Sequence, residues 1–263
     1  MRQAVLERRK REMAVLAGIT RYMRILTLFD AQRPHWTIAE IAEALEASPS
    51  TLYRLVREMV AVDLLENTVE SRFRLGPLFV EYYRRINLTD PLIRSGSKFL
   101  GPLARQTGVP CVAILARLYG KAVMCVAEHR DPSADFKTSY ELGRPMPLLR
   151  GATSRAVLST LPKRSLTALV TEALKDDAPR RDALLGEIAG LRKLGISETS
   201  GEVDKGLVGI SAPLRNTALG IHASVSVIVE ASVLNDERRP QIYTAISTTA
   251  RMIEAFMADS QTP

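Results

Sequence analysis

Apolar residues recur every three or four positions through the first third of the chain, which is the spacing of helices that bury one face. After the basic cluster Arg8–Arg11, this spacing first appears at Ile19, Tyr22, Met23 and Leu26. It predicts an amphipathic helix that ends before Gln32-Arg33-Pro34. A second helix is predicted directly after this break.

A capping box opens the second predicted helix. Thr37 can accept a hydrogen bond from an otherwise unpaired amide at the helix start, and Glu40 can accept one from the backbone of Thr37 in return. The helix is predicted to end at Leu45. Its buried positions would be Ile38, Ile41, Ala42 and Leu45.

A third helix is predicted to begin only two residues later, because Ser48 suits the N-cap and Pro49 suits the first helical position. Its apolar stripe consists of Leu52, Leu55, Val56 and Met59. A polar stripe with the same spacing lies on another face and consists of Ser50, Tyr53, Arg54 and Arg57. This helix would therefore pack on one side and present a complete polar face on the other.

The next segment, LLENTVESRFRLG, predicts two short strands around the polar turn Asn67–Glu70. In the second strand Arg72 and Arg74 alternate with Phe73 and Leu75. Three helices followed by a hairpin form a winged helix-turn-helix.

The polar face of the third helix has the chemistry of a helix that enters the major groove of DNA. Arginine binds guanine through two hydrogen bonds, hydroxyl groups bind phosphates or base edges, and hairpin arginines can take backbone phosphates. The predicted DNA-binding residues are Arg21, Thr37, Ser48, Ser50, Thr51, Tyr53, Arg54, Arg57, Arg72 and Arg74. The alternative is a merely solvated helix face. Glu40, Glu43 and Glu46 also weigh against DNA binding, because they would repel phosphate if they pointed the same way.

The hydrophobic period changes in the rest of the chain. Residues up to Asn87 keep a helical pattern, and Asp90-Pro91 then begins another helix that stops at Gly108. Strand-like runs are predicted at 109–118, 122–130, 136–142, 195–199, 208–213 and 221–229, and helices at 152–161, 165–175, 182–194 and 237–259. We therefore predict an α+β protein of two domains, residues 1–88 and 89–263, the second a sheet covered by helices.

Composition and charge add little to this picture. The chain is 46% hydrophobic and 25% charged, as in soluble globular proteins, and no run approaches the roughly 20 apolar residues of a membrane helix. The charged N-terminus lacks the apolar core of a signal peptide, so a cytoplasmic protein is expected. The net charge of +7 is not concentrated in the predicted DNA-binding half. Cys111 and Cys125 lack CxxC spacing and are predicted to be small buried hydrophobes.

No complete catalytic motif is present in the sequence. Gly120-Lys121 lacks the earlier glycine of a P-loop, and the histidines lie far apart without a metal-binding motif. Ser95–Lys98 matches SxxK but lacks the partner motifs of serine acyl-enzymes. We therefore predict neither an enzyme nor a bound cofactor or metal.

A small-molecule site is more plausible than a catalytic one. Residues 143–155 run from a proline-rich loop into a helix start, where backbone amides, with Thr153 and Ser154, could hold an anion such as a carboxylate. An ordinary helix cap explains the same segment equally well.

Over essentially its whole length the sequence resembles the IclR family of bacterial transcriptional regulators. The resemblance lies in TIAEIAEALEASPSTLYRLVREMVAVDLLE and FRLGP, then in LARQTGVPCVAIL, GRPMPL, GATSRAVLSTLP and EIAGLRKLGIS. It implies a winged helix joined by a linker helix to a GAF-like effector-binding and oligomerisation domain. It also implies homodimers or homotetramers that bind palindromic operator DNA under the control of a small organic acid.

The same resemblance assigns an effector pocket. Carried over position by position, it falls on Met146, Ala152, Thr153, Thr199, Leu207, Gly209 and Ser226. The chain departs from the family in several places: Ser154-Arg155 replace a usual Gly-Lys pair, Thr199-Ser200 replace frequent acidic residues, Gly209 a frequent cysteine and Ile228 a frequent serine. Met146, Leu207 and Ile228 favour a more apolar or aromatic acid over a very small polar one. The alternatives are a protein-binding module and an enzyme acting in the second domain.

Overall fold

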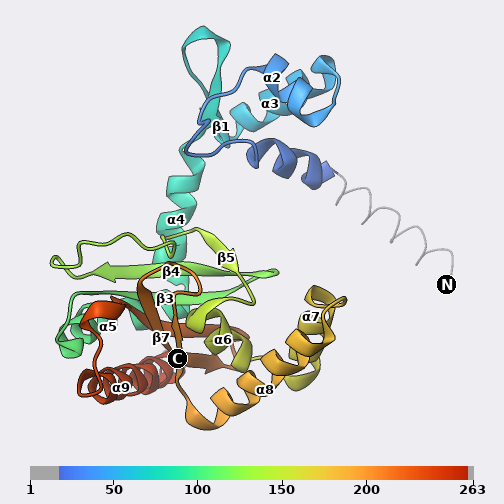
Figure 1. The fold of residues 1–263 in the computed structure, drawn as a ribbon. Coiled ribbons are helices and arrows are strands. Elements are labelled where there is room, and N and C mark those ends of the chain that lie inside the picture. Colours follow the sequence, from blue (N-terminus) through green and yellow to red (C-terminus); the bar gives the residue numbers. More distant parts are fainter. Residues whose placement is uncertain (1–17, 260–263) are drawn as a thin grey trace. The chain divides into compact units, whose positions relative to one another are not determined.

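The computed structural model describes residues 18–259, and the basic cluster Arg8–Arg11 lies outside this range. The chain divides into two compact units, Met1–Leu88 and Thr89–Pro263, and each unit has its own hydrophobic core (Figure 1). Within residues 18–259, no helix combines the length and the apolar character that crossing a membrane requires.

The helix-turn-helix of the first unit begins where the capping signals predict. Helix α2 (Ile38–Leu45) has the complete capping box, since the Glu40 amide donates to Thr37 Oγ1 at 3.2 Å and the Thr37 amide donates to Glu40 Oε2 at 2.7 Å. Helix α3 (Pro49–Ala61) is capped by Ser48 and has proline in its first turn. Its predicted stripe of Leu52, Leu55, Val56 and Met59 is buried.

The first helix, residues 18–26, buries a different face from the predicted one. Ile19 and Met23 are about half exposed, whereas Ile25 and Phe29 are buried. The periodicity fits both stripes, because Tyr22, Ile25, Leu26 and Phe29 have the same i, i+3, i+4, i+7 spacing. Packing against Trp36 and α3 in one shared core selects the second stripe.

The wing follows as predicted. Strands β1 (Leu65–Asn67) and β2 (Phe73–Leu75) pair antiparallel, with Glu66 opposite Arg74. Trp36 forms an isolated bridge to Phe73, so the hairpin is also tied to the loop before α2. The predicted winged helix-turn-helix is therefore confirmed.

One helix crosses the boundary between the units, and the next begins the second unit. Helix α4 (Leu78–Thr89) is followed by α5 (Pro91–Thr107), whose N-cap Asp90 accepts a hydrogen bond from the Ile93 amide. Helix α5 ends at Gly108, as predicted, and this glycine adopts the left-handed conformation.

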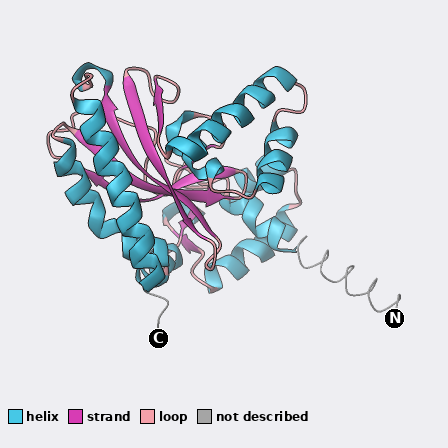
Figure 2. Cartoon of the chain, turned by 90° about the horizontal axis from the view of Figure 1, so that it is seen from below, coloured by secondary structure: helices cyan, strands magenta, loops and turns pink. Residues whose placement is uncertain are grey.

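The second unit is built on one six-stranded antiparallel sheet in the order β5-β4-β3-β8-β7-β6. The strands are β3 (Cys111–Tyr119), β4 (Ala122–Arg130), β5 (Pro145–Pro147), β6 (Ser197–Ser200), β7 (Leu207–Asn216) and β8 (Ile221–Glu230). One face packs against α5 and the long α9 (Arg238–Asp259), which form the helix pair along one side of the sheet in Figure 2. The other face packs against α6 (Gly151–Ser159) and, near β3 and β4, against α7 (Lys163–Ala173) and α8 (Ala178–Leu194). The α+β fold is therefore confirmed.

One predicted strand, residues 136–142, is wrong. Only Leu142 forms an isolated bridge, and the short edge strand is β5 instead. The Ser139 amide donates to the carboxylate of Asp204, as do the hydroxyls of Thr138 and Ser139. Polar groups that would belong to a strand are thus bound to a distant acidic side chain.

Both cysteines are buried, as predicted, and neither forms a disulfide. Burial raises the pKa of the Cys125 thiol to about 12, so it stays protonated at neutral pH. In the described part of the chain, no group of three or more His, Cys, Asp or Glu side chains is placed to hold a metal ion.

Candidate functional site

The exposed face of α3 is the first candidate site. Ser50, Tyr53, Arg54 and Arg57 all lie on solvent-facing positions of the helix, opposite the buried apolar stripe. Arg54 Nη1 lies 4.0 Å from Glu58 one turn later, in a loose and exposed pair. Arg57 forms no ion pair with any residue in the range 18–259. The helix therefore offers two arginines and two hydroxyl groups to a partner.

Hydroxyl groups at the start of α3 bond to each other. Ser48 Oγ accepts from the Thr51 amide and donates to Thr51 Oγ1 at 2.8 Å, while Ser50 Oγ lies 3.4 Å from Ser48 Oγ. Elsewhere in the unit, Arg21 is exposed on the first helix and Thr37 is half-buried at the cap of α2. Each predicted DNA-binding residue thus keeps some surface exposure.

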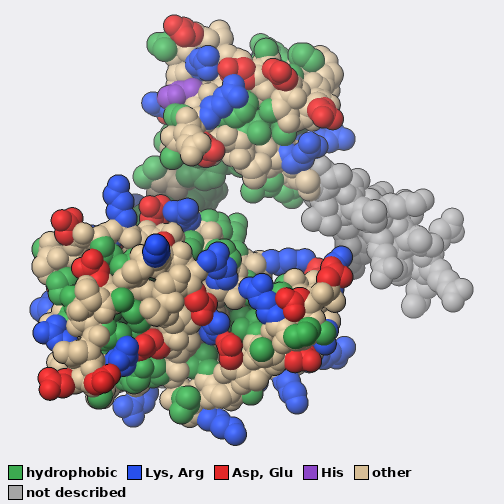
Figure 3. Space-filling view, viewed as in Figure 1, with side chains coloured by type: hydrophobic (Ala, Val, Ile, Leu, Met, Phe, Trp, Pro, Cys, Tyr) green, Lys and Arg blue, Asp and Glu red, His purple; other side chains and the backbone are tan. Residues whose placement is uncertain are grey.

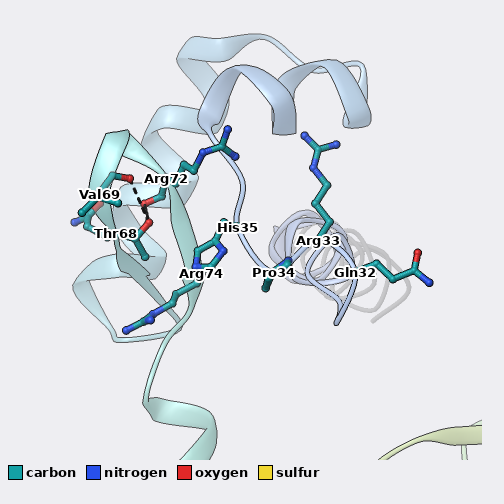
Figure 4. Close-up of a pocket in the computed structure, with 9 residues that line it drawn as sticks. Gln32, Arg33, Pro34, His35, Thr68, Val69, Arg72 and Arg74 are labelled. Carbon is teal, nitrogen blue, oxygen red and sulfur yellow. Dashed lines mark hydrogen bonds between the residues drawn. The ribbon is translucent and has the colours of Figure 1, made fainter.

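A groove of about 660 Å³ lies between the loop before α2 and the wing (Figure 4). It is lined by Gln32, Arg33, Pro34, His35, Asn67, Thr68, Val69, Arg72 and Arg74. The guanidinium groups of Arg33 and Arg72 both point toward α2, where they pair with Glu40 at 2.8 and 3.4 Å. Arg74 points the other way and pairs with Glu66.

The carboxylate of Glu40 is therefore engaged within the unit. The Thr37 amide lowers its pKa most strongly, and the Thr37 hydroxyl, Arg33 and Arg72 lower it further. Arg33 also stacks on Trp36, with its guanidinium carbon 3.5 Å from the ring centre. Of the three acidic residues expected to oppose DNA, Glu40 is thus compensated by two arginines. The sequence prediction missed Arg33, because nothing in its own spacing marks it.

Acidic and basic side chains are interspersed on the visible face of both units (Figure 3). The net charge of +7 is therefore not gathered there into one basic patch. Any DNA-binding role rests on the individual groups of α3 and the wing.

The second candidate site is a small cavity at the start of α6, here named the α6 cavity. It is lined by Thr138, Tyr140, Gly151, Ala152, Thr153, Thr199, Glu202, Val203, Asp204, Leu207, Gly209 and Ile228. Five of the seven residues predicted for an effector pocket are among them. Its volume of about 20 Å³ has room for about one water molecule. A pocket for a drug-sized ligand needs about 300 Å³ or more, so the cavity must widen to admit an organic acid.

The other two predicted residues lie next to this cavity without lining it. Met146 is buried in a cluster with Tyr140, Leu207 and Ile228. Ser226 is fully buried and accepts hydrogen bonds from Thr153 Oγ1 at 3.0 Å and from Ser211 Oγ at 2.8 Å. These hydroxyls join α6 to the sheet.

The backbone amide at the start of α6 binds a carboxylate of the chain itself, that of Glu202. The Gly151 amide donates to Glu202 Oε2 at 3.0 Å, and the Ala152 amide donates to Thr199 Oγ1 at 3.0 Å. Of the two hydroxyls considered for an anion site, Ser154 donates instead to the Pro147 carbonyl at 2.9 Å, and Thr153 to Ser226. Sequence reasoning missed Glu202 and Asp204, which lie in an irregular segment without periodicity, and Tyr140, which was assigned to the incorrect strand 136–142.

Comparisons with known proteins assign both units. Residues 18–68 match the family described as IclR helix-turn-helix domain, and residues 89–255 match the family described as bacterial transcriptional regulator IclR C-terminal. The HTH-type transcriptional regulator KipR of Bacillus subtilis is 21% identical over 240 residues, which cover 89% of this chain and 94% of KipR.

Solved structures of IclR proteins share the fold. A putative IclR regulator from a Silicibacter species has a TM-score of 0.76 at 18% identity, covering 91% of this chain and 95% of its own. An IclR homologue from Microbacterium hydrocarbonoxydans, solved in complex with 4-hydroxybenzoate, has a TM-score of 0.74 at 18% identity, covering 92% and 99%. With the two family matches, which together span both units, these findings show that the chain belongs to the IclR family of transcriptional regulators, which are DNA-binding proteins with an effector domain and not enzymes.

Proposed function

We propose that this chain binds operator DNA through α3 and the wing, and that a small organic acid entering the α6 cavity changes its affinity for that DNA. The exposed face of α3 carries this proposal, because its arginines and hydroxyl groups are the groups that read base edges in a major groove. Such a protein works in the cytoplasm, where its operators lie.

Aromatic acids are the favoured class of effector. Leu207 and Ile228 make one side of the α6 cavity apolar, with Met146 packed beside them, while the amides of α6 and nearby hydroxyls make the other side polar. The complex of the Microbacterium homologue with 4-hydroxybenzoate supports this class. The residues proposed to contact the acid are Met146, Ala152, Thr153, Thr199, Leu207, Gly209 and Ser226.

The working form is proposed to be a homodimer or homotetramer. Helix α4 has no buried residue, and its exposed side chains include an apolar stripe of Phe79, Tyr82, Tyr83 and Ile86. A second copy of the chain would cover this stripe, and two recognition helices would then read two half-sites. Sedimentation of the full chain tests this, since a monomer at micromolar concentration would contradict it.

Fluorescence anisotropy tests the DNA-binding proposal directly. Duplexes that tile the region upstream of the protein's own gene and the adjacent operon are compared with scrambled duplexes of the same composition at physiological salt. Specific binding should exceed binding to the scramble at least about a thousandfold. Its affinity should also fall steeply with salt.

Two other results would redirect the assignment. Equal binding to every tile and to the scramble would mean that the operator lies elsewhere in the genome or that the protein binds DNA without sequence specificity. No salt-dependent binding to any duplex would favour the protein-binding function of the winged helix.

A further inference from the structure

The loop between β6 and β7 closes over the α6 cavity. Its ends are Gly201 and Gly206, whose φ angles of +66° and +81° are readily adopted only by glycine. Between them, Glu202, Val203 and Asp204 all line the cavity. We name residues 201–206 the Glu202 loop.

Two carboxylates fasten this loop to its surroundings. Asp204 accepts hydrogen bonds from the Thr138 hydroxyl at 3.0 Å and from the Ser139 amide at 2.8 Å. Glu202 accepts from the Gly151 amide at 3.0 Å and from Arg155 Nη1 at 2.6 Å. The Glu202 carboxylate therefore occupies the anion position at the N-terminus of α6.

A third donor beside this position has no acceptor. Tyr140 is only 4% exposed, and its hydroxyl lines the cavity without a hydrogen bond of acceptable geometry to any residue in the described range. Burial raises the pKa of this phenol, and the nearby hydroxyls of Thr153 and Ser154, which donate to Ser226 and Pro147, act in the opposite direction. It lies against Gly151, since a Cβ atom placed on that glycine would be 3.3 Å from the phenolic oxygen. Buried hydroxyl groups almost always have partners, so this hydroxyl is available to an acceptor that enters the cavity.

We infer that the Glu202 carboxylate is an internal stand-in for the carboxylate of the effector. An incoming organic acid displaces it from the Gly151 amide and Arg155, the Glu202 loop lifts, and the Tyr140 hydroxyl donates to the acid as a third ligand. This inference rests on the proposed function only in taking the effector to be an acid. The carboxylate site itself does not depend on DNA binding.

Chemical rescue of Glu202→Ala tests the carboxylate site without knowing the effector. The substitution removes the equivalent of an acetate group next to the Gly151 amide. Sodium acetate should raise the melting temperature of the full-length variant by several degrees more than equal acetamide with matched sodium chloride. The wild-type protein should not distinguish the two. Glu187→Ala is the matched control, because Glu187 also pairs with Arg155, at 2.8 Å, but does not accept from Gly151. Equal effects of acetate and acetamide on Glu202→Ala would overturn the inference.

The role of Tyr140 has its own measurement. In the Glu202→Ala background, Tyr140→Phe should weaken acetate binding roughly three- to tenfold, as expected when one hydrogen bond is removed. Tyr119→Phe, at an exposed position of β3, should leave it unchanged. Unchanged affinity in the Tyr140 variant would remove this residue from the site.

Aromatic acids then connect the site to the effector. By calorimetry, Glu202→Gln should bind benzoate and 4-hydroxybenzoate about tenfold more tightly than the wild type does, because a neutral amide competes less well for the Gly151 amide and Arg155. The neutral 4-hydroxybenzamide should not show this gain. Absence of acid binding to both proteins would overturn the link to an aromatic effector. Failure of operator binding alone would contradict the regulatory role but not the carboxylate site at the start of α6.

Discussion

At the scale of single residues, Arg54 and Arg57 supply the only positive charges on the exposed face of α3. The side chain of Arg54 is 67% exposed, and its pair with Glu58 is long and solvated. Exposed pairs of this kind contribute about 0–1 kcal/mol to folding. Loss of Arg54 should therefore affect DNA binding far more than stability.

We predict that Arg54→Ala weakens operator binding by about 1–3 kcal/mol for each guanine that the arginine reads, while the melting temperature stays nearly unchanged. Anisotropy on the operator and on scrambled DNA measures this. Arg251→Ala, an exposed arginine of α9, is the control and should bind normally. An equal loss on operator and scrambled DNA would mean that Arg54 contacts phosphate and reads no base.

Gly151 combines a left-handed backbone conformation with a close neighbour. Its φ is +83°, and a Cβ atom there would lie 2.7 Å from Val203 Cγ2 in the Glu202 loop. We predict that Gly151→Ala destabilises the second unit by about 1–3 kcal/mol. The control Gly186→Ala, in an open position of α8, should stabilise it by up to about 1 kcal/mol. Urea denaturation followed by circular dichroism would show whether the two substitutions have opposite signs.

Single residues also show what the sequence could and could not predict. Ser50, Tyr53, Arg54 and Arg57 could be placed on one face, because helical spacing fixes the relative direction of side chains. Glu202 could not be placed, since its partner Gly151 lies 51 positions earlier and no local pattern couples them. Contacts between residues so far apart in the sequence depend on how the whole domain folds.

At the scale of elements, the capping box of α2 links stability to pH. The folded-state pKa of Glu40 lies below its ordinary value of 4.5, so the ionised carboxylate stabilises the first unit fully above that pH. This contribution is lost as the pH falls through the folded-state pKa.

We therefore predict that the urea midpoint of the first unit falls between about pH 6 and about pH 3.5, and falls less in Glu40→Gln than in the wild type. Trp36 fluorescence measures this unit alone, because Trp36 is the single tryptophan of the chain and lies in the core of the first unit. Glu43→Gln, which changes an exposed carboxylate of the same helix, should behave as the wild type does. Parallel pH profiles for Glu40→Gln and the wild type would contradict the prediction.

Elements with their own start and stop signals were the most predictable. Thr37, Ser48-Pro49 and Asp90-Pro91 each mark a helix start that the structure confirms. The first helix was assigned the wrong buried face, because two apolar stripes share Tyr22 and Leu26 and only tertiary packing selects between them. Residues 136–142 have strand-like composition, but Asp204 binds their polar groups.

At the scale of the whole molecule, the two cores share no residue. Separate cores predict separate cooperative transitions. Trp36 fluorescence should report unfolding of the first unit, while far-UV circular dichroism is dominated by the larger second unit. We predict that the two urea curves of the full chain do not coincide. Coincident curves, with one midpoint and one slope, would show that the units unfold together.

Because the Glu202 carboxylate is part of the chain, it affects how DNA binding would respond to the concentration of an effector acid. A tethered competitor acts at a fixed effective concentration, of millimolar order for short flexible connections, whatever the abundance of the protein. Trace amounts of an acid would leave the α6 cavity closed. Only an acid that outcompetes the tethered Glu202 carboxylate would change the affinity for DNA. The length and stiffness of the segment from Gly201 to Gly206 would then set the sensitivity of the regulator, separately from the contacts that choose its ligand.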